Sequence, residues 1–114
     1  MRKGWCDPRL EAVEVPTEWD LGWATALMEG EGSFVLNKSS KNRKWTTAHA
    51  VIVQKKPWIL HRLKRLFGGS VSSTLNKGVR YHRWQVYGDR ARTFKRLVYH
   101  GLSPHKKKQA DRIK

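Results

Sequence analysis

Two pairs of segments along the chain alternate apolar and polar residues, which is the period of a half-buried β-strand. A polar, basic loop joins the first pair, residues 33–38 and 45–55. An Asn-Lys-Gly turn joins the second pair, residues 70–75 and 79–87. Each pair therefore predicts a β-hairpin. The alternation gathers these apolar side chains on one face: Phe34, Leu36, Ala48, Ala50, Ile52, Val71, Trp84 and Val86.

Helix signals stand before, between and after the two hairpins. Thr17 and Asp20 form a Thr-x-x-Asp version of the capping box, which predicts that a helix begins there. Pro57 suits the first turn of a second helix, because its missing N–H would have no partner there in any case. This helix is expected to end at residues 68–69, both glycine. We expect Asp89 to cap a third helix, and a short terminal helix to begin near residue 105.

This order of elements predicts the fold class. A helix, two strands, a helix, two strands and a helix give an α+β domain of αββαββα order. Its four-stranded antiparallel sheet would be a saddle with the helices on one face. Residues 17–114 are expected to form this single domain. Residues 1–16 contain two prolines and show no sustained period, so they are treated as an N-terminal extension without a predicted structure.

The composition of the chain limits the classes of partner and function that it can have. The chain has 114 residues, a formal net charge of +15 and a pI of about 10.6, which favours a nucleic-acid partner over an anionic membrane surface. Six tryptophans indicate a folded core rather than a disordered basic tail. The single cysteine excludes an internal disulfide. No apolar run approaches the ~18 residues of a membrane span, and no signal-peptide pattern is evident, so we expect a soluble intracellular protein without a membrane partner.

The charge is unevenly distributed. Residues 1–31 contain seven of the nine acids and only three of the 24 Lys and Arg residues, which leaves two acids against 21 bases in the remainder. The second face of the predicted sheet is polar, and a curved antiparallel sheet can lie in the major groove of DNA. A merely solvated face is the alternative. The expected DNA-binding residues are Asn37, Trp45, Thr47, His49, Ser72, Thr74, Tyr81, Arg83 and Gln85.

Two of the few acids stand where the first helix should end. Glu29 and Glu31 lie near the negative end of the helix dipole, where each acid costs roughly 0.3–1 kcal/mol. A divalent cation between such carboxylates and phosphate oxygens would reverse the repulsion. Both acids could instead be ordinary exposed charges. On the same helix Gly22, Ala26 and Gly30 recur every four residues, which lets another helix approach closely, although simple helix capping would also explain some of these glycines.

The stretch ATALMEGEG, residues 24–32, followed by Ser33 and Phe34, resembles a divergent LAGLIDADG motif of homing endonucleases. The resemblance extends over residues 17–112. VIVQKKPWILHRLKRLFGGSV is similar to the family's second strand, second helix and glycine-rich turn, and RYHRWQV to its fourth strand. LSPHKKKQA resembles the closing segment of the family.

The resemblance implies roles for residues of the motif. Gly22, Ala26 and Gly30 would form the interface between two motif helices. Glu31 would bind the divalent metal at the DNA backbone, and Glu29 would have a structural role at the helix end.

It also implies roles outside the motif. Gln54 would help to position water or metal. Lys106 would be the active-site lysine that stabilises charge developing on the phosphate, although Lys107 or Lys108 could take its place. A basic residue that the family often has shortly after the glutamine is missing here, so a cation of the second helix, Arg62 or Arg65, would have to replace it.

One motif per chain implies a homodimer with two-fold symmetry. The function implied is that of a site-specific double-strand DNA endonuclease, a homing endonuclease that uses Mg²⁺ or another divalent cation such as Mn²⁺ on a palindromic or near-palindromic site. Alternatives are an inactive DNA-binding protein of the same fold and an intron maturase, for which intron RNA would be the partner. A structural RNA-binding protein is a third possibility.

Overall fold

The computed structural model describes residues 14–38 and 46–113. Along the chain come helix α1 (Glu18–Glu31), strands β1 (Gly32–Lys38) and β2 (Thr46–Gln54), helix α2 (Pro57–Phe67), strands β3 (Ser70–Asn76) and β4 (Val79–Tyr87), helix α3 (Asp89–Val98), a 3₁₀ turn (Tyr99–Gly101) and helix α4 (Pro104–Ala110). The predicted αββαββα order and the α+β class are confirmed. None of the helices within the described ranges has the length and apolar composition needed to cross a bilayer.

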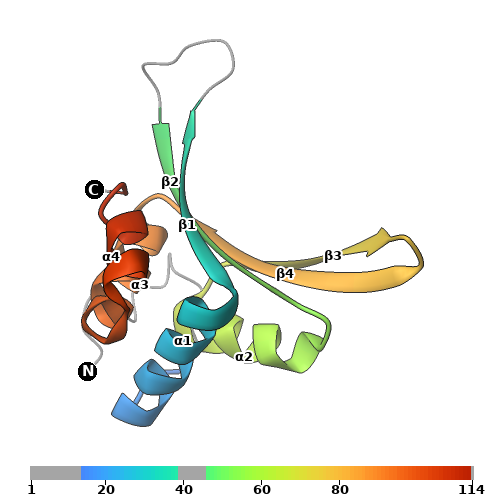
Figure 1. The fold of residues 1–114 in the computed structure, drawn as a ribbon. Helices are drawn as coiled ribbons and strands as arrows, with labels where there is room; N and C mark the ends of the chain where they lie inside the picture. Colours follow the sequence, from blue (N-terminus) through green and yellow to red (C-terminus); the bar gives the residue numbers. More distant parts are fainter. Residues whose placement is uncertain (1–13, 39–45, 114) are drawn as a thin grey trace.

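The four strands form one antiparallel sheet in the order β1-β2-β4-β3. The two hairpins meet along β2 and β4, where Ala50 pairs with Val86 and Ile52 with Trp84. Figure 1 shows the hairpins diverging from this seam into a saddle, with the helices on one side. The β3–β4 turn is made by Lys77 and Gly78, whose φ angles of 51° and 79° fit the two-residue turns that match strand twist.

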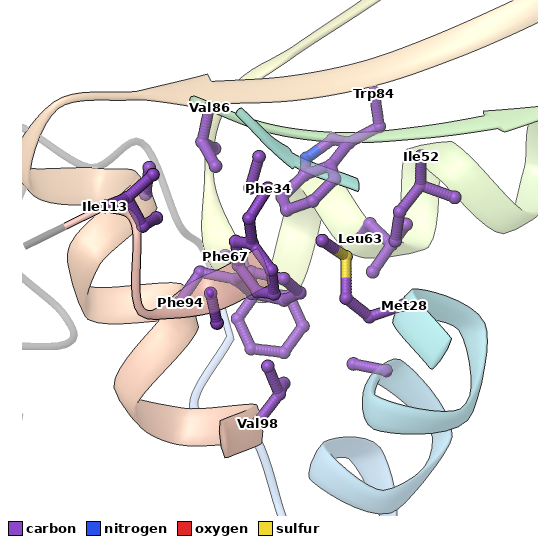
Figure 2. Packing of buried hydrophobic residues seen from close by; sticks show 14 of the residues in the cluster. Met28, Phe34, Ile52, Leu63, Phe67, Trp84, Val86, Phe94, Val98 and Ile113 are labelled. Atoms are coloured by element: carbon purple, nitrogen blue, oxygen red, sulfur yellow. The ribbon is translucent and has the colours of Figure 1, made fainter. Parts of the chain in front are cut away.

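The core lies between the sheet and the helices. The apolar face predicted from the alternation is the buried face, and Phe34, Ile52 and Trp84 on it are at most 2% exposed. Three aromatic rings form its centre, with Phe94 contacting Phe67 and Trp84 edge-on at centroid distances of 5.0 Å each (Figure 2). Such pairs contribute roughly 0.5–1.5 kcal/mol beyond the apolar area that they bury. This core fixes α1 and α3 against the sheet.

The start of α1 is held by the predicted capping box. The Thr17 hydroxyl accepts a hydrogen bond from the Asp20 N–H at 3.1 Å, and the Asp20 carboxylate accepts one from the Thr17 N–H at 2.9 Å. Arg62 of α2 donates to the same carboxylate at 2.7 Å. The Thr17 N–H and the Arg62 guanidinium hold the pKa of the buried Asp20 carboxyl below its ordinary value. Asp20 therefore caps α1 and joins it to α2.

The start of α3 differs by one residue from the prediction. Gly88, not Asp89, is the N-cap, and Asp89 is the first helical residue, whose side chain accepts a hydrogen bond from Arg92 at 2.8 Å. The backbone leaves β4 through a φ of 61° and a ψ of −131° at Gly88, a conformation that other residues adopt only with strain. The glycine takes the cap position for this reason.

The N-terminal extension is described only from Glu14 onward. The Glu14 N–H donates to the Arg65 carbonyl at 3.1 Å, and Arg65 Nε donates to the Glu14 carboxylate at 2.8 Å. The segment just before α1 therefore packs along the second half of α2.

Candidate active site and nucleic-acid interface

Glu31 lies at the point where α1 passes into β1. It is the last residue of α1, and its side chain is exposed without a hydrogen bond or ion pair to any described residue. An open hollow of about 390 Å³ is lined by Glu31, Val53, Gln54, Lys55, Lys56 and Tyr81. The fold thus brings Glu31 and Gln54 to one hollow, although they are 23 positions apart along the chain.

Lys106 reaches the same junction from α4. Its ammonium group donates to the Gly32 carbonyl at 2.9 Å, and Gly32 directly follows Glu31. A side chain at position 32 would overlap Met28, so glycine is required for this packing. Lys107 instead lies over the Tyr99 ring, 5.4 Å from its centroid. Of the lysines considered from the sequence, Lys106 therefore contacts the residue that follows Glu31, although it does not line the hollow.

Glu29 is not part of the hollow. Its carboxylate accepts hydrogen bonds from the Ser103 N–H at 2.9 Å and from the Ser103 hydroxyl at 2.8 Å. The Ser103 N–H, the Ser103 hydroxyl and the charges of Lys106 and His105 together hold the pKa of Glu29 below its ordinary value. Ser103 is also the N-cap of α4, so the carboxylate lies at the positive end of that helix. The Ser-Pro pair indicates that a helix begins at Ser103, but no local signal in the sequence indicates that Glu29 is its partner.

The cations that line the hollow come from the short segment between β2 and α2. Arg62 is bound to Asp20 at the opposite end of α1, and Arg65 is bound to Glu14, so the expectation that one of them serves the site is wrong. Their positions on α2 face the start of α1 and the segment before it. Lys55 and Lys56 line the hollow instead, and the Lys55 ammonium lies 5.9 Å from the centroid of the Tyr81 ring.

The donor set of the hollow fits a hard divalent cation only in part. Glu31 supplies one carboxylate and Gln54 one amide oxygen, and oxygen is the ligand that Mg²⁺ prefers. Within the described ranges there is no group of three His, Cys, Asp or Glu residues that could hold a metal ion. A metal here would need further oxygen ligands from phosphate, water or a second chain.

The polar side chains predicted to bind DNA share the sheet face opposite the helices. Residues paired across the ladder point to the same side, as with Asn37 and Thr47, Ser72 and Arg83, and Thr74 and Tyr81. Asn37, Thr47, Ser72, Thr74 and Arg83 are exposed. We call this the outer face of the sheet. Trp45 lies outside the described residues.

His49 and Gln85 lie on the outer face but interact with their neighbours. His49 is only 7% exposed, and its ring stacks on that of Tyr87 with centroids 4.2 Å apart. Its two nitrogens lie 3.2 Å from Asn37 Nδ2 and 3.3 Å from Gln85 Oε1. The neighbouring side chains occupy both ring nitrogens of His49, and its predicted role in DNA binding stays a prediction.

The small residues of α1 form an uncovered surface. Gly22, Ala26 and Gly30 are exposed, and a Cβ added at Gly22 or Gly30 would meet no atom of the described residues within 4 Å. Trp19, one turn before Gly22, is 70% exposed. A second backbone could therefore approach this side of α1 closely.

Comparisons with known proteins bear on the fold. No protein-family model and no curated protein sequence matches the chain. The homing endonuclease I-CvuI, in complex with its target, is similar at a TM-score of 0.65 and 17% identity, over 82% of this chain and 62% of that one. The archaeal intron-encoded homing endonuclease I-Vdi141I, complexed with DNA, is similar at a TM-score of 0.62 and 18% identity, over 78% of this chain and 61% of that one.

A third similar structure is the LAGLIDADG meganuclease I-CpaMI bound to uncleaved DNA, with a TM-score of 0.56 and 17% identity, over 76% of this chain and 32% of that one. The chain thus spans less than two thirds of the length of each of these structures. These likenesses, the αββαββα order and the four-stranded saddle lead to one conclusion: the chain has the fold of the LAGLIDADG homing endonucleases.

Proposed function

We propose that the protein is a site-specific double-strand DNA endonuclease that acts as a homodimer with Mg²⁺ or a similar divalent cation. The observation that carries the proposal is the position of Glu31. It is an exposed carboxylate at the end of α1 without a partner among the described residues, shares a hollow with Gln54, and lies beside the uncovered side of the same helix. The similarity to structures of homing endonucleases bound to their DNA supports this proposal.

The chemistry follows from the groups around the hollow. Glu31 would hold the metal together with phosphate oxygens, and the bound cation would lower the pKa of a water and stabilise charge on the phosphate. The Gln54 amide can accept from that water or donate to a phosphate oxygen. The ammonium groups of Lys55, Lys56 and Lys106 attract the DNA backbone and oppose the negative charge that builds up during hydrolysis.

A second copy of the chain would complete the site. Two copies related by a two-fold axis, with Gly22, Ala26 and Gly30 of each α1 in contact, would bring the two Glu31 carboxylates near the axis. Each copy then supplies one of the ligands that a single chain lacks. Such symmetry requires a palindromic or near-palindromic DNA site.

The outer face would lie in the major groove of each half-site. It carries the exposed Arg83 and polar side chains from all four strands, the groups that reach base edges and phosphates. The strongly basic composition after residue 31 supports binding to a polyanion.

The proposal is tested by incubating the protein and Mg²⁺ with DNA spanning the locus of its own gene, and with a library of randomised two-fold-symmetric sites. We expect discrete double-strand cleavage by the wild type and none by Glu31→Gln. This variant should still bind the DNA sequence that the wild type cleaves. Asp89→Asn is the matched control, because it removes the same charge from an exposed carboxylate on α3 and should leave cleavage unchanged. Wild-type cleavage rates for Glu31→Gln would overturn the assignment.

Binding measurements on the same wild-type protein distinguish the alternative functions. Duplex binding without cleavage by the wild type would indicate a DNA-binding protein of this fold. Tighter binding to structured intron RNA than to any duplex at equal salt concentration would indicate a maturase or another RNA-binding role.

A further inference from the structure

Four side chains on the outer face form one connected cluster across three strands. Asn37 Nδ2 of β1 donates to His49 Nδ1 of β2 at 3.2 Å, and His49 Nε2 lies 3.3 Å from Gln85 Oε1 of β4. The Tyr87 hydroxyl, also on β4, donates to the same Gln85 oxygen at 3.1 Å, and its ring stacks on the imidazole at an interplanar angle of 6°. The cluster spans the seam between the hairpins.

His49 links the two amides because a neutral imidazole has one donor and one acceptor nitrogen. Burial keeps the pKa of His49 below its ordinary value, and the nearby charge of Arg83 acts in the same direction, although the hydrogen bond to Gln85 opposes them. With Nδ1 accepting from Asn37, the proton must be on Nε2, which donates to Gln85. The Asn37 amide therefore points its nitrogen at the imidazole, whereas the Gln85 amide points its oxygen at it.

The oxygen of the Gln85 amide is fully occupied within the cluster. An amide oxygen has two lone pairs, and here His49 and Tyr87 occupy both of them. The two N–H groups of the Gln85 amide donate to no described side chain. Gln85 also lines an open hollow of about 270 Å³ on this part of the molecule, together with Ser70 and Arg90, which leaves space for a ligand atom.

We propose that His49 is a positioning residue that makes Gln85 a donor-only reader of DNA, selecting guanine at one base pair of each half-site. A glutamine that reads adenine uses its oxygen to accept from N6 and its nitrogen to donate to N7. The occupied oxygen of Gln85 cannot make the first of these bonds. Guanine presents two adjacent acceptors in the major groove, N7 and O6, so the amide nitrogen can donate to either or share a hydrogen bond between them, whereas adenine presents only N7 beside its own N6 donor. This inference rests on the proposed DNA-binding function.

The test is selection of bound sites from a randomised half-site library, with Ca²⁺ in place of Mg²⁺ so that cleavage does not deplete them. Gln85→Ala identifies the base pair that Gln85 reads, as the one position whose preference it abolishes. The wild type should favour guanine over adenine there by roughly 5-fold, the lower end of the range given for a good base contact, because one nitrogen makes the contact. His49→Phe keeps a ring stacked on Tyr87 but frees the amide, and should reduce the preference to near unity at this position alone.

Two further readouts separate positioning from a structural role. Tyr87→Phe keeps the stack and releases one lone pair, so it should raise the acceptance of adenine at the same base pair without altering thermal stability. In ¹⁵N spectra of the free protein, the proton of the neutral His49 ring should be on Nε2. Thermal melts verify that His49→Phe is folded.

Several results would overturn the inference. They are adenine preferred at the Gln85 position, guanine preference unchanged in His49→Phe, no position affected by Gln85→Ala, or the imidazole proton on Nδ1. If the wild type enriches no DNA sequence at all, the proposed function fails, and this inference fails with it. Enrichment at other positions with no effect of Gln85→Ala would leave the proposed function intact and reject only the role of His49 and Gln85.

Discussion

The carboxylate of Glu29 accepts two hydrogen bonds from Ser103, a residue 74 positions away that caps α4. An acid at the negative end of a helix is unfavourable in isolation, but here it lies at the positive end of another helix. Two carboxylates that stand close together in the sequence thus have different environments. Glu29 joins α1 to α4, whereas Glu31 has no partner among the described residues.

Glu29→Ala should destabilise the protein, because it removes both hydrogen bonds and leaves the Ser103 N–H without its partner. Denaturant unfolding should show a lower midpoint for Glu29→Ala and no comparable loss for Glu31→Ala, the matched substitution two residues away. Equal midpoints for the two variants would contradict the docking role of Glu29.

The stability contributed by the hydrogen bonds between Glu29 and Ser103 should depend on pH. The folded pKa of Glu29 is depressed below its ordinary 4.5, so the unfolded state binds more protons at acidic pH. The stability that Glu29 contributes is therefore fully present above pH 4.5 and is lost as pH falls through the lower folded pKa. The difference in unfolding midpoint between wild type and Glu29→Gln, measured from neutral pH downward, should shrink in that range.

Substitution of Asp20 should be costly at the other end of α1. Asp20→Ala removes the reciprocal half of the capping box and leaves Arg62 without its ion-pair partner, and we expect a loss of about 1–3 kcal/mol in the free energy of unfolding. Glu18→Ala, an exposed first-turn acid of the same helix, is the control and should cost much less. A loss for Asp20→Ala no larger than that of the control would argue against the cap.

Local signals in the sequence were enough to locate most of these elements. The capping box of Thr17 and Asp20, the Pro57 start of α2 and the alternation in both hairpins each depend on residues a few positions apart. Asp89 was misplaced by one residue because both Gly88 and Asp89 are good N-cap residues, and only the backbone angle at the end of β4 decides between them.

Contacts between distant segments could not be predicted in this way. Nothing local determines that β2 rather than β1 adjoins β4, or that Ser103 binds Glu29. The site itself was only partly foreseen. Glu31 and Gln54 do share a hollow, but the basic residue missing shortly after the glutamine was sought on α2, whose arginines bind Asp20 and Glu14.

The choice among the lysines of α4 can be tested by activity. Lys106→Ala should lower the rate of DNA cleavage by about 100-fold, the effect of removing one group that stabilises transition-state charge. Lys107→Ala should lower it far less, because that ammonium lies over the Tyr99 ring, away from the Glu31 junction. Equal losses in the two variants, measured at saturating DNA, would show that general charge and not position is responsible.

The uncovered side of α1 yields a prediction in which stability and assembly change in opposite directions. In Gly22→Leu the new Cβ meets no atom of the described residues within 4 Å, and leucine replaces a poor helix former, so the free energy of unfolding of the monomer should rise by roughly 0.5–1 kcal/mol. The same side chain would occupy the space that a second α1 needs. Sedimentation should therefore find a wild-type dimer and a Gly22→Leu monomer, and cleavage should be lost with the dimer. A dimer that persists in Gly22→Leu would place the interface elsewhere on the chain.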